Sequence, residues 1–359
     1  MTVQQAKQLY TQALVAVYTD QTAPLSFLRS FFKDSTSDTK LVSVEVQRGT
    51  EKVAIDVVRG TNGNRNSISR STERIIEPPM YDEFLDATSL DAYDNYFGAG
   101  ASTPTASTAA RFLNSAGSKL ALIRNKIERA YELQASQALF DGIVQLKNGD
   151  NIDYKRKAGS LVDLGAGSYW SAANAATADP LADFKNAGDF LRNVGKMRGG
   201  VLNVVLGGDA YAAMLQMDKF KETSDLRRID LVDITGPVQN SVGGVLHGEV
   251  SAGNYKVRLW TYPEVYTDAN GDQQDYVPQN KFLALPEMTN FNLAYAATPV
   301  VMDLPTNSAF NSAVRQKKGK YNMYDYVDKR KATHNMGLRS AGIAILTAVD
   351  QVYTAQVLA

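Results

Sequence analysis

The sequence predicts an α+β fold in which one very long helix and one long β-hairpin accompany a compact unit of alternating helices and strands. Three patterns support this prediction: period-two alternation around a turn sequence in residues 41–80, helical periodicity in residues 118–146, and alternating short elements in residues 176–290. The 359 residues are enough for one large or two medium domains with a substantial core.

The N-terminal segment, residues 1–40, begins with a loosely amphipathic helical pattern over residues 1–20. It continues with APLSFLRSFFKDS, in which five large apolar residues lie close together: Leu25, Phe27, Leu28, Phe31 and Phe32. Such dense apolar surface favours burial. We expect it to dock on the core of its own chain, and packing against a partner is the alternative.

Residues 41–80 have the pattern of one long hairpin. The runs LVSVEVQ and KVAIDVV alternate apolar and polar residues, as half-buried strands do, and TNGN at 61–64 is a hairpin turn because Asn and Gly tolerate positive φ. The outer part has little apolar surface and carries four arginines, with Glu73 as the one acid among them: Arg59, Arg65, Arg70 and Arg74. An isolated two-stranded ribbon is marginal in water, so we expect this one to become ordered against another surface.

The segment SKLALIRNKIERAYELQASQALFDGIVQL, residues 118–146, is the clearest helix in the sequence. Its apolar residues recur at i, i+3, i+4 and i+7, and charged residues occupy the remaining faces. At about 1.5 Å per residue the helix would span roughly 43 Å, far more than the usual three turns. The following sequence, NGDNIDYKRKAGS, predicts a short strand pair.

Residues 176–290 predict a compact α/β unit with its own core. Its expected elements are helices at 181–198 and 208–217 and strands at 201–207, 255–262, 275–279 and 280–286. Asn270-Gly271 between two strand patterns indicates a hairpin turn, and its spacing does not fit an acidic calcium loop. The chain then returns through strands near 291–302, and the apolar ending GIAILTAVDQVYTAQVLA predicts a buried strand pair.

The residue types argue against catalysis. The chain has no cysteine, which excludes disulfides, thiolate metal sites and thiol nucleophiles. Its two histidines, His247 and His334, have no metal-binding or catalytic-triad spacing. We therefore expect no enzyme activity, no metal and no cofactor. The N-terminus lacks a secretory pattern and no apolar run reaches 18 residues, so we expect a soluble protein made in a cytoplasm, with no membrane contact.

The charge balance makes general nucleic-acid binding a minor alternative. Lys+Arg and Asp+Glu both number 38, whereas a dedicated nucleic-acid binder usually has a basic excess. Such binding would have to use residues 59–74 and the basic, tyrosine-containing segment 315–331. The basic residues of the second segment are Arg315, Lys317, Lys318, Lys320, Lys329, Arg330 and Lys331. Tyrosines at this spacing also fit an ordinary strand or a protein interface.

Six motifs in order resemble the lambda-type head protein family of tailed-bacteriophage major capsid proteins, which have the HK97-type fold. They are PLSFLRSFFKDS, AYELQASQALFDGIVQLKNGDNIDYKR, SYWSAANAATADPLAD, FKETSDLRR, ANGDQQDYVPQNKFLALP and RSAGIAILTAVDQVYTAQVLA. They are distributed over nearly the full length of the chain. The chain departs from the pattern over residues 89–117, which are rich in Gly, Ser and Thr, and at Gly342, where the family usually has Pro.

The resemblance implies a role for each region. Residues 41–80 would be the E-loop, 176–290 the axial (A) domain, and 81–175 with 291–359 the peripheral (P) domain, whose spine helix is 118–146. The four hairpin arginines would contact a neighbouring subunit, and the basic segment 315–331 would face another capsomer or DNA. Hexamers and pentamers would form an icosahedral shell around double-stranded DNA, bound without sequence specificity.

The resemblance also implies a scaffolding protein, a portal and in some members a decoration protein, with assembly in the host bacterial cytoplasm and the virion as destination. An encapsulin-like compartment shell has the same fold and is the main alternative, although no cargo signal is present. Some members of the fold form Lys–Asn cross-links through an E-loop lysine. Because Lys52 is the one lysine in these strands and none lies near the tip, we expect no such cross-link.

Overall fold

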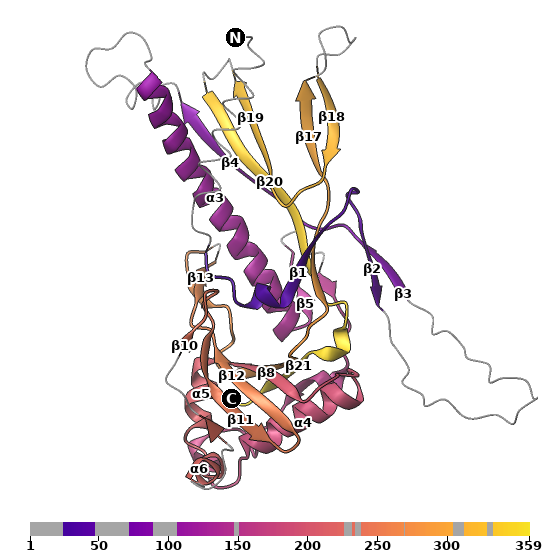
Figure 1. Ribbon diagram of the computed structural model, residues 1–359, viewed down its shortest axis with the longest axis vertical. Coiled ribbons are helices and arrows are strands. Elements are labelled where there is room, and N and C mark those ends of the chain that lie inside the picture. Colours follow the sequence, from indigo (N-terminus) through magenta and orange to yellow (C-terminus); the bar gives the residue numbers. More distant parts are fainter. Residues whose placement is uncertain are drawn as a thin grey trace, which may run out of the picture.

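A computed structural model describes residues 24–46, 72–88, 106–146, 151–225, 232–233, 238–268, 270–303, 312–328 and 333–359. The long helix and several strands make up one end of an elongated molecule, and a sheet with three short helices makes up the other (Figure 1). The helix predicted over residues 1–20 and the outer part of the predicted hairpin lie outside the described residues.

The long helix, α3, runs from Ala106 to Phe140, so it begins and ends earlier than the predicted range of 118–146. Gly142 ends it: its φ of 71° lies in the left-handed region, and its N–H donates to the carbonyl of Gln137 (3.0 Å). A β-carbon at this position would also meet the Arg156 side chain. The next residues form β5 (Ile143–Val144), which pairs with β6 (Ile152–Asp153), and this confirms the predicted short strand pair.

A five-stranded sheet packs against α3. It comprises β1 (Phe32–Thr36), β16 (Phe291–Tyr295), β20 (Thr333–Ile345), β19 (Asn322–Asp328) and β4 (Met80–Thr88). Two antiparallel pairs accompany it: β2 (Val42–Val46) with β3 (Thr72–Ile76), and β17 (Thr298–Asp303) with β18 (Ser312–Lys317). One face of the helix and one face of this sheet share a hydrophobic core that includes Ile127, Tyr131, Leu293 and Ile343. This burial, more than intrinsic propensity, stabilises so long a helix.

The second sheet has eight strands. Its path is β10 (Val238–Gln239), β11 (Val245–Ala252), β12 (Tyr255–Thr261), β8 (Val201–Leu206), β15 (Lys281–Pro286), β21 (Tyr353–Gln356) and β7 (Leu161–Asp163), and β9 (Val232–Asp233) pairs with β11. The accompanying helices are α4 (Pro180–Asn193), α5 (Gly208–Met214) and α6 (Asp218–Asp225). Along β15, Phe282 and Ala284 belong to a core on one face, whereas Leu283 and Leu285 join the core shared with α3. Burial on both faces explains why this strand is apolar throughout.

Several predicted details are wrong for identifiable reasons. The strand predicted at 275–279 is instead β14 (Gln273–Asp275), so residues 276–279 are not a strand. β14 forms a hairpin with β13 (Val265–Thr267), which confirms the predicted Asn-Gly turn. The helix predicted to reach residue 198 ends at Asn193, and the one predicted to reach 217 ends at Met214. The two C-terminal strands, β20 and β21, are buried but lie in different sheets, so they are not a strand pair. Hydropathy reports burial and does not identify the pairing partner.

Candidate assembly surfaces and a buried polar joint

The base of the predicted hairpin is present as β2 and β3. They pair antiparallel from Val42 opposite Ile76 to Val46 opposite Thr72, and Arg74 lies opposite Val44. Figure 1 shows this pair extending away from the rest of the described chain. Arg59, Arg65 and Arg70 lie outside the described residues.

The two faces of this pair differ in burial. Val42 and Ile76 reach the core, whereas Ile75 is 63% exposed. The chain continues through Pro78 and Pro79 directly into β4, where Met80 and Phe84 are 51% and 55% exposed. We call these three residues, Ile75, Met80 and Phe84, the apolar strip. Sequence reasoning missed it, although the i, i+4 spacing of Met80 and Phe84 on a strand places them on one face.

A polar cluster connects three strands beside the apolar strip. Asp82 on β4 accepts hydrogen bonds from the hydroxyl of Tyr324 (2.6 Å) and from Nε of Arg339 (2.7 Å). The Arg339 guanidinium also lies over the Tyr324 ring, 4.3 Å from its centre. Asp82 and Arg339 thus find partners within the subunit. The exposed apolar side chains of the strip have no such cover.

The basic segment 315–331 is divided by the fold. Lys317 and Lys318 are exposed at the end of β18, and Lys318 pairs with Asp38 (3.2 Å). Arg315 lies within β18 opposite Val300, and Lys329, Arg330 and Lys331 lie outside the described residues. Lys320, in contrast, points into the molecule and lies 3.4 Å from both Asp34 and Glu128. Burial, and secondarily the nearby Arg29, lowers the pKa of the Lys320 amine to about 8.

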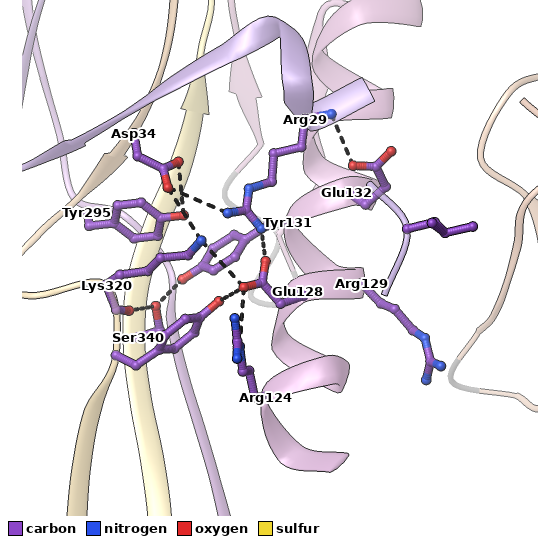
Figure 2. Close-up of polar contacts among 12 residues, drawn as sticks. Arg29, Asp34, Arg124, Glu128, Arg129, Tyr131, Glu132, Tyr295, Lys320 and Ser340 are labelled. Atoms are coloured by element: carbon purple, nitrogen blue, oxygen red, sulfur yellow. Dashed lines mark hydrogen bonds and ion pairs between the residues drawn. The ribbon is translucent and has the colours of Figure 1, made fainter. Parts of the chain in front are cut away.

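Lys320 belongs to a buried polar joint between the N-terminal segment, α3 and the five-stranded sheet (Figure 2). Its central residue is Glu128 of α3, which is almost fully buried and pairs with Arg29; the Tyr321 hydroxyl also donates to it. One turn later, Glu132 accepts hydrogen bonds from two backbone N–H groups, those of Leu28 (2.8 Å) and Arg29 (3.0 Å). Figure 2 shows Arg129, between them in sequence, pointing away from this joint.

The two glutamates are needed because buried polar groups require partners. The short helix η1 (Leu28–Phe31) has no side-chain cap of its own, and Glu132 supplies acceptors for its first N–H groups. Burial raises the pKa of Glu132 to about 7, although the two backbone hydrogen bonds oppose this shift. In the sequence, Glu128 and Glu132 directly follow the apolar residues Ile127 and Tyr131, so they lie at the border of the apolar face of the helix.

Within the described ranges, no three His, Cys, Asp or Glu side chains are placed to hold a metal ion. His247 stacks on Tyr211 with ring centres 4.1 Å apart and hydrogen-bonds the Thr261 hydroxyl (2.7 Å), which is a structural role. Among the helices that the structure describes, none is both long enough and apolar enough to cross a membrane.

A comparison with known families decides the class of this protein. The sequence profile of the family described as phage major capsid protein E matches residues 11–341, which is most of the chain. The chain belongs to this family. It is therefore a shell-forming phage capsid protein, and its place is the capsid shell of the virion. No curated relative matches the chain significantly.

Solved structures confirm the predicted HK97-like α+β fold. A structure assigned to the capsid protein of a prophage of E. coli CFT073 has a TM-score of 0.63 and 14% identity, covering 98% of this chain and 99% of that one. A phage-related protein from Bordetella bronchiseptica RB50 has a TM-score of 0.49 and 12% identity, with 96% and 95% coverage. An encapsulin complex from Synechococcus elongatus PCC 7942 has a TM-score of 0.44 and 11% identity, also with 96% and 95% coverage. At scores below 0.5 the last two likenesses do not favour one kind of shell over another.

Proposed function

We propose that identical subunits of this capsid protein assemble into hexamers and pentamers that close an icosahedral shell around packaged double-stranded DNA. The observation that carries this proposal is the β2–β3 pair, which leaves the body of the subunit with Ile75 exposed and continues into the exposed Met80 and Phe84. Exposed apolar side chains gathered along one stretch of chain are typical of protein interfaces. A neighbouring subunit would supply the surface that the hairpin lacks.

The parts of the subunit take the following roles in this proposal. Residues 41–80 are the E-loop, which reaches across a neighbour, and Arg59, Arg65, Arg70 and Arg74 pair with acids there. The A domain, residues 176–290, meets its copies around the capsomer axis, with β7 and β21 completing its sheet. The P domain, residues 81–175 and 291–359 with α3 as its spine, joins capsomers. Many moderate contacts repeated by symmetry give the shell its strength.

The wider assembly follows from the same proposal. A scaffolding protein would guide the first shell in the host bacterial cytoplasm, a portal would occupy one vertex, and a decoration protein would bind outside. DNA would be held through its backbone without sequence specificity. The exposed Lys317 and Lys318, with Arg315, Lys329, Arg330 and Lys331, would face DNA or another capsomer, whereas Lys320 acts within the subunit. The protein would have no enzymatic role.

The test is negative-stain microscopy with light scattering on the purified full-length protein and on a variant lacking residues 60–70. This deletion removes the hairpin tip but leaves β2 and β3 complete. We expect shells, tubes or ring-shaped capsomers from the intact protein and their loss from the variant. An unchanged circular dichroism spectrum and thermal midpoint would show that the variant still folds. A folded variant that assembles as well as the intact chain would contradict the role of the E-loop.

A further inference from the structure

We call residues 24–34 the N-terminal clasp. They contact two parts of the subunit that are distant from them in sequence, the eight-stranded sheet and helix α3. On the sheet side, the Ser26 N–H donates to the carbonyl of Val242 (3.1 Å), and the Tyr262 hydroxyl donates to the carbonyl of Leu25 (3.1 Å). On the helix side, the clasp contacts Glu128 and Glu132 of α3.

Phe27 is the apolar anchor of the clasp. Its buried ring lies 5.3 Å from the ring of Trp260 and 5.6 Å from that of Tyr262, both at the end of β12. A β-carbon at Gly244 would come within 2.4 Å of the Phe27 ring, so the glycine leaves the space that the ring fills. The chain just before β11 therefore leaves room for the Phe27 ring, which packs closely against Gly244.

Helix α3 is attached to the same sheet at a second place, near its C-terminus. Arg156 donates to the carbonyl of Leu139 (2.7 Å) and to the Oγ1 of Thr354 on β21 (3.1 Å). Glu132 precedes Leu139 by about 10 Å along the helix axis at 1.5 Å per residue. The helix also contacts this side of the molecule through the core that includes Leu283 and Leu285 and through the Ser136 hydroxyl, which donates to the carbonyl of Tyr276. The two separated polar attachments add to these contacts and restrain the orientation of the helix.

We propose that the N-terminal clasp locks the spine helix to the eight-stranded sheet, and that Glu132 is the positioning residue that holds the clasp closed. The carboxyl group of Glu132, which is buried, accepts from two adjacent backbone N–H groups of η1, and Phe27 occupies the sheet side of the same segment. Opening the clasp would expose the two N–H groups and the Phe27 ring to solvent. The orientation of helix and sheet within one subunit would then become variable.

This arrangement makes opening dependent on pH. The titratable and charged groups around Glu132 are Arg29 of η1, Tyr262 directly after β12, Tyr276 after β14 and Glu128 one turn earlier on α3, whereas the Arg129 side chain points away. Burial raises the pKa of Glu132 from 4.5 to about 7, so the closed state binds a proton that the open state releases. The closed clasp gains stability as pH falls from about 7 towards 4.5 and loses it as pH rises over that window. Above about pH 7 the dependence should level off.

The first test is hydrogen–deuterium exchange at the amides of Leu28 and Arg29 in the full-length protein, corrected for intrinsic exchange rates. We expect at least about tenfold greater protection at pH 5 than at pH 8, since one unit of pKa difference is worth tenfold. Glu132→Gln, a neutral isostere of the protonated side chain, should abolish this dependence and keep protection near the wild-type level at pH 5. Glu132→Ala, which supplies no acceptor for the two N–H groups, should lower protection at both pH values. Glu83→Gln is the matched control, since Glu83 pairs with Lys126 at the surface, and it should follow the wild type. Equal pH dependence in wild type and Glu132→Gln would overturn the proposal.

The second test measures the orientation itself by electron–electron resonance. Because the chain has no cysteine, spin labels can be placed at Lys126→Cys on α3 and Lys221→Cys on α6, both well-exposed positions. Labelled subunits are diluted with unlabelled ones to remove distances between subunits. We expect a narrow distance distribution with Glu83→Gln and a broad one with Glu132→Ala and with Phe27→Ala. Narrow distributions in both folded variants would overturn the lock.

The proposal concerns contacts within one subunit, although its use in a shell rests on the proposed function. Subunit shape sets the angles between neighbours, so an open clasp should broaden the distribution of particle diameters. Exchange and spin-label distances do not require assembly. A clasp that behaves as expected in a protein that forms no shells would contradict the proposed function alone. Shells of uniform diameter formed by variants with an unlocked helix would contradict the clasp's effect on shell size and leave the lock within the subunit intact.

Discussion

The N-terminal clasp and the β2–β3 pair are both apolar in sequence but have opposite fates in the subunit. The clasp buries Phe27 and Leu28 and finds acceptors for its backbone in Glu132. The β2–β3 pair buries Ile76 but leaves its neighbour Ile75 exposed. The difference indicates which surface the subunit completes by itself and which it leaves for a neighbour, because exposed apolar area costs free energy until something covers it.

The largest expected effect is on the clasp. Phe27→Ala removes a buried ring and should lower the free energy of unfolding by about 3–5 kcal/mol. Ile75→Ala, on the exposed side of the comparison, should change it by less than about 0.5 kcal/mol. Chemical denaturation of the unassembled protein measures both. If Phe27→Ala and Ile75→Ala lower the free energy of unfolding by similar amounts, the clasp and the β2–β3 pair do not differ in burial as described.

A substitution that fills the space around Phe27 tests how closely this ring is packed. Gly244→Ala places a methyl group against the Phe27 ring, and the overpacking should cost about 1–3 kcal/mol. Gly167→Ala is the control, since no atom lies within 4 Å of its added carbon. Thermal unfolding should separate the two variants clearly, and an unaffected Gly244→Ala would show that the clasp is loosely packed.

The apolar strip should affect assembly and not folding. Replacing Ile75 and Phe84 together by serine should leave the unfolding free energy within roughly 0.5 kcal/mol per site, since both side chains are exposed. The yield of shells should fall, because the same side chains would be buried between subunits. Sedimentation of assembled material measures the yield, and Met288→Ser is a matched control because Met288 is 85% exposed and lies in the loop after β15. If Met288→Ser lowers the yield of shells as much as the double variant does, the apolar strip has no specific role in assembly.

The smallest expected effect is on the surface ion pair between Lys318 and Asp38. Both side chains are largely exposed, so Lys318→Ala should cost no more than about 1 kcal/mol and less at high salt. Denaturant titrations at two salt concentrations test this. A cost of several kcal/mol would mean that this pair is part of the buried joint.

Much of the fold could be predicted from the sequence because the patterns that indicate helices, strands and turns are local. Alternation identified the base of the hairpin, helical periodicity identified α3, and Asn270-Gly271 identified the turn between β13 and β14. The boundaries of α3 were not predictable in this way, since its start lies in a run of small residues and its end depends on Gly142 against Arg156. Family resemblance, carried by six ordered motifs, supplied the function.

The buried joint could not be predicted because its contacts are distant in sequence. Glu132 meets the backbone of Leu28 across 104 residues, and Lys320 reaches Asp34 across 286. As a sequence feature, Lys320 was one member of a basic run. Lys320 is partly buried whereas Lys317 and Lys318 are exposed, and the chain turns between them at Gly319, whose φ is 152°.

The central claim is that the hairpin and the apolar strip are completed by a neighbouring copy. Cryo-electron microscopy of assembled particles tests it most directly, by showing what lies on Ile75, Met80 and Phe84. We predict that these side chains are buried against an adjacent subunit and that residues 47–71 extend across it. Particles in which the strip faces solvent and the hairpin folds back on its own subunit would contradict the claim.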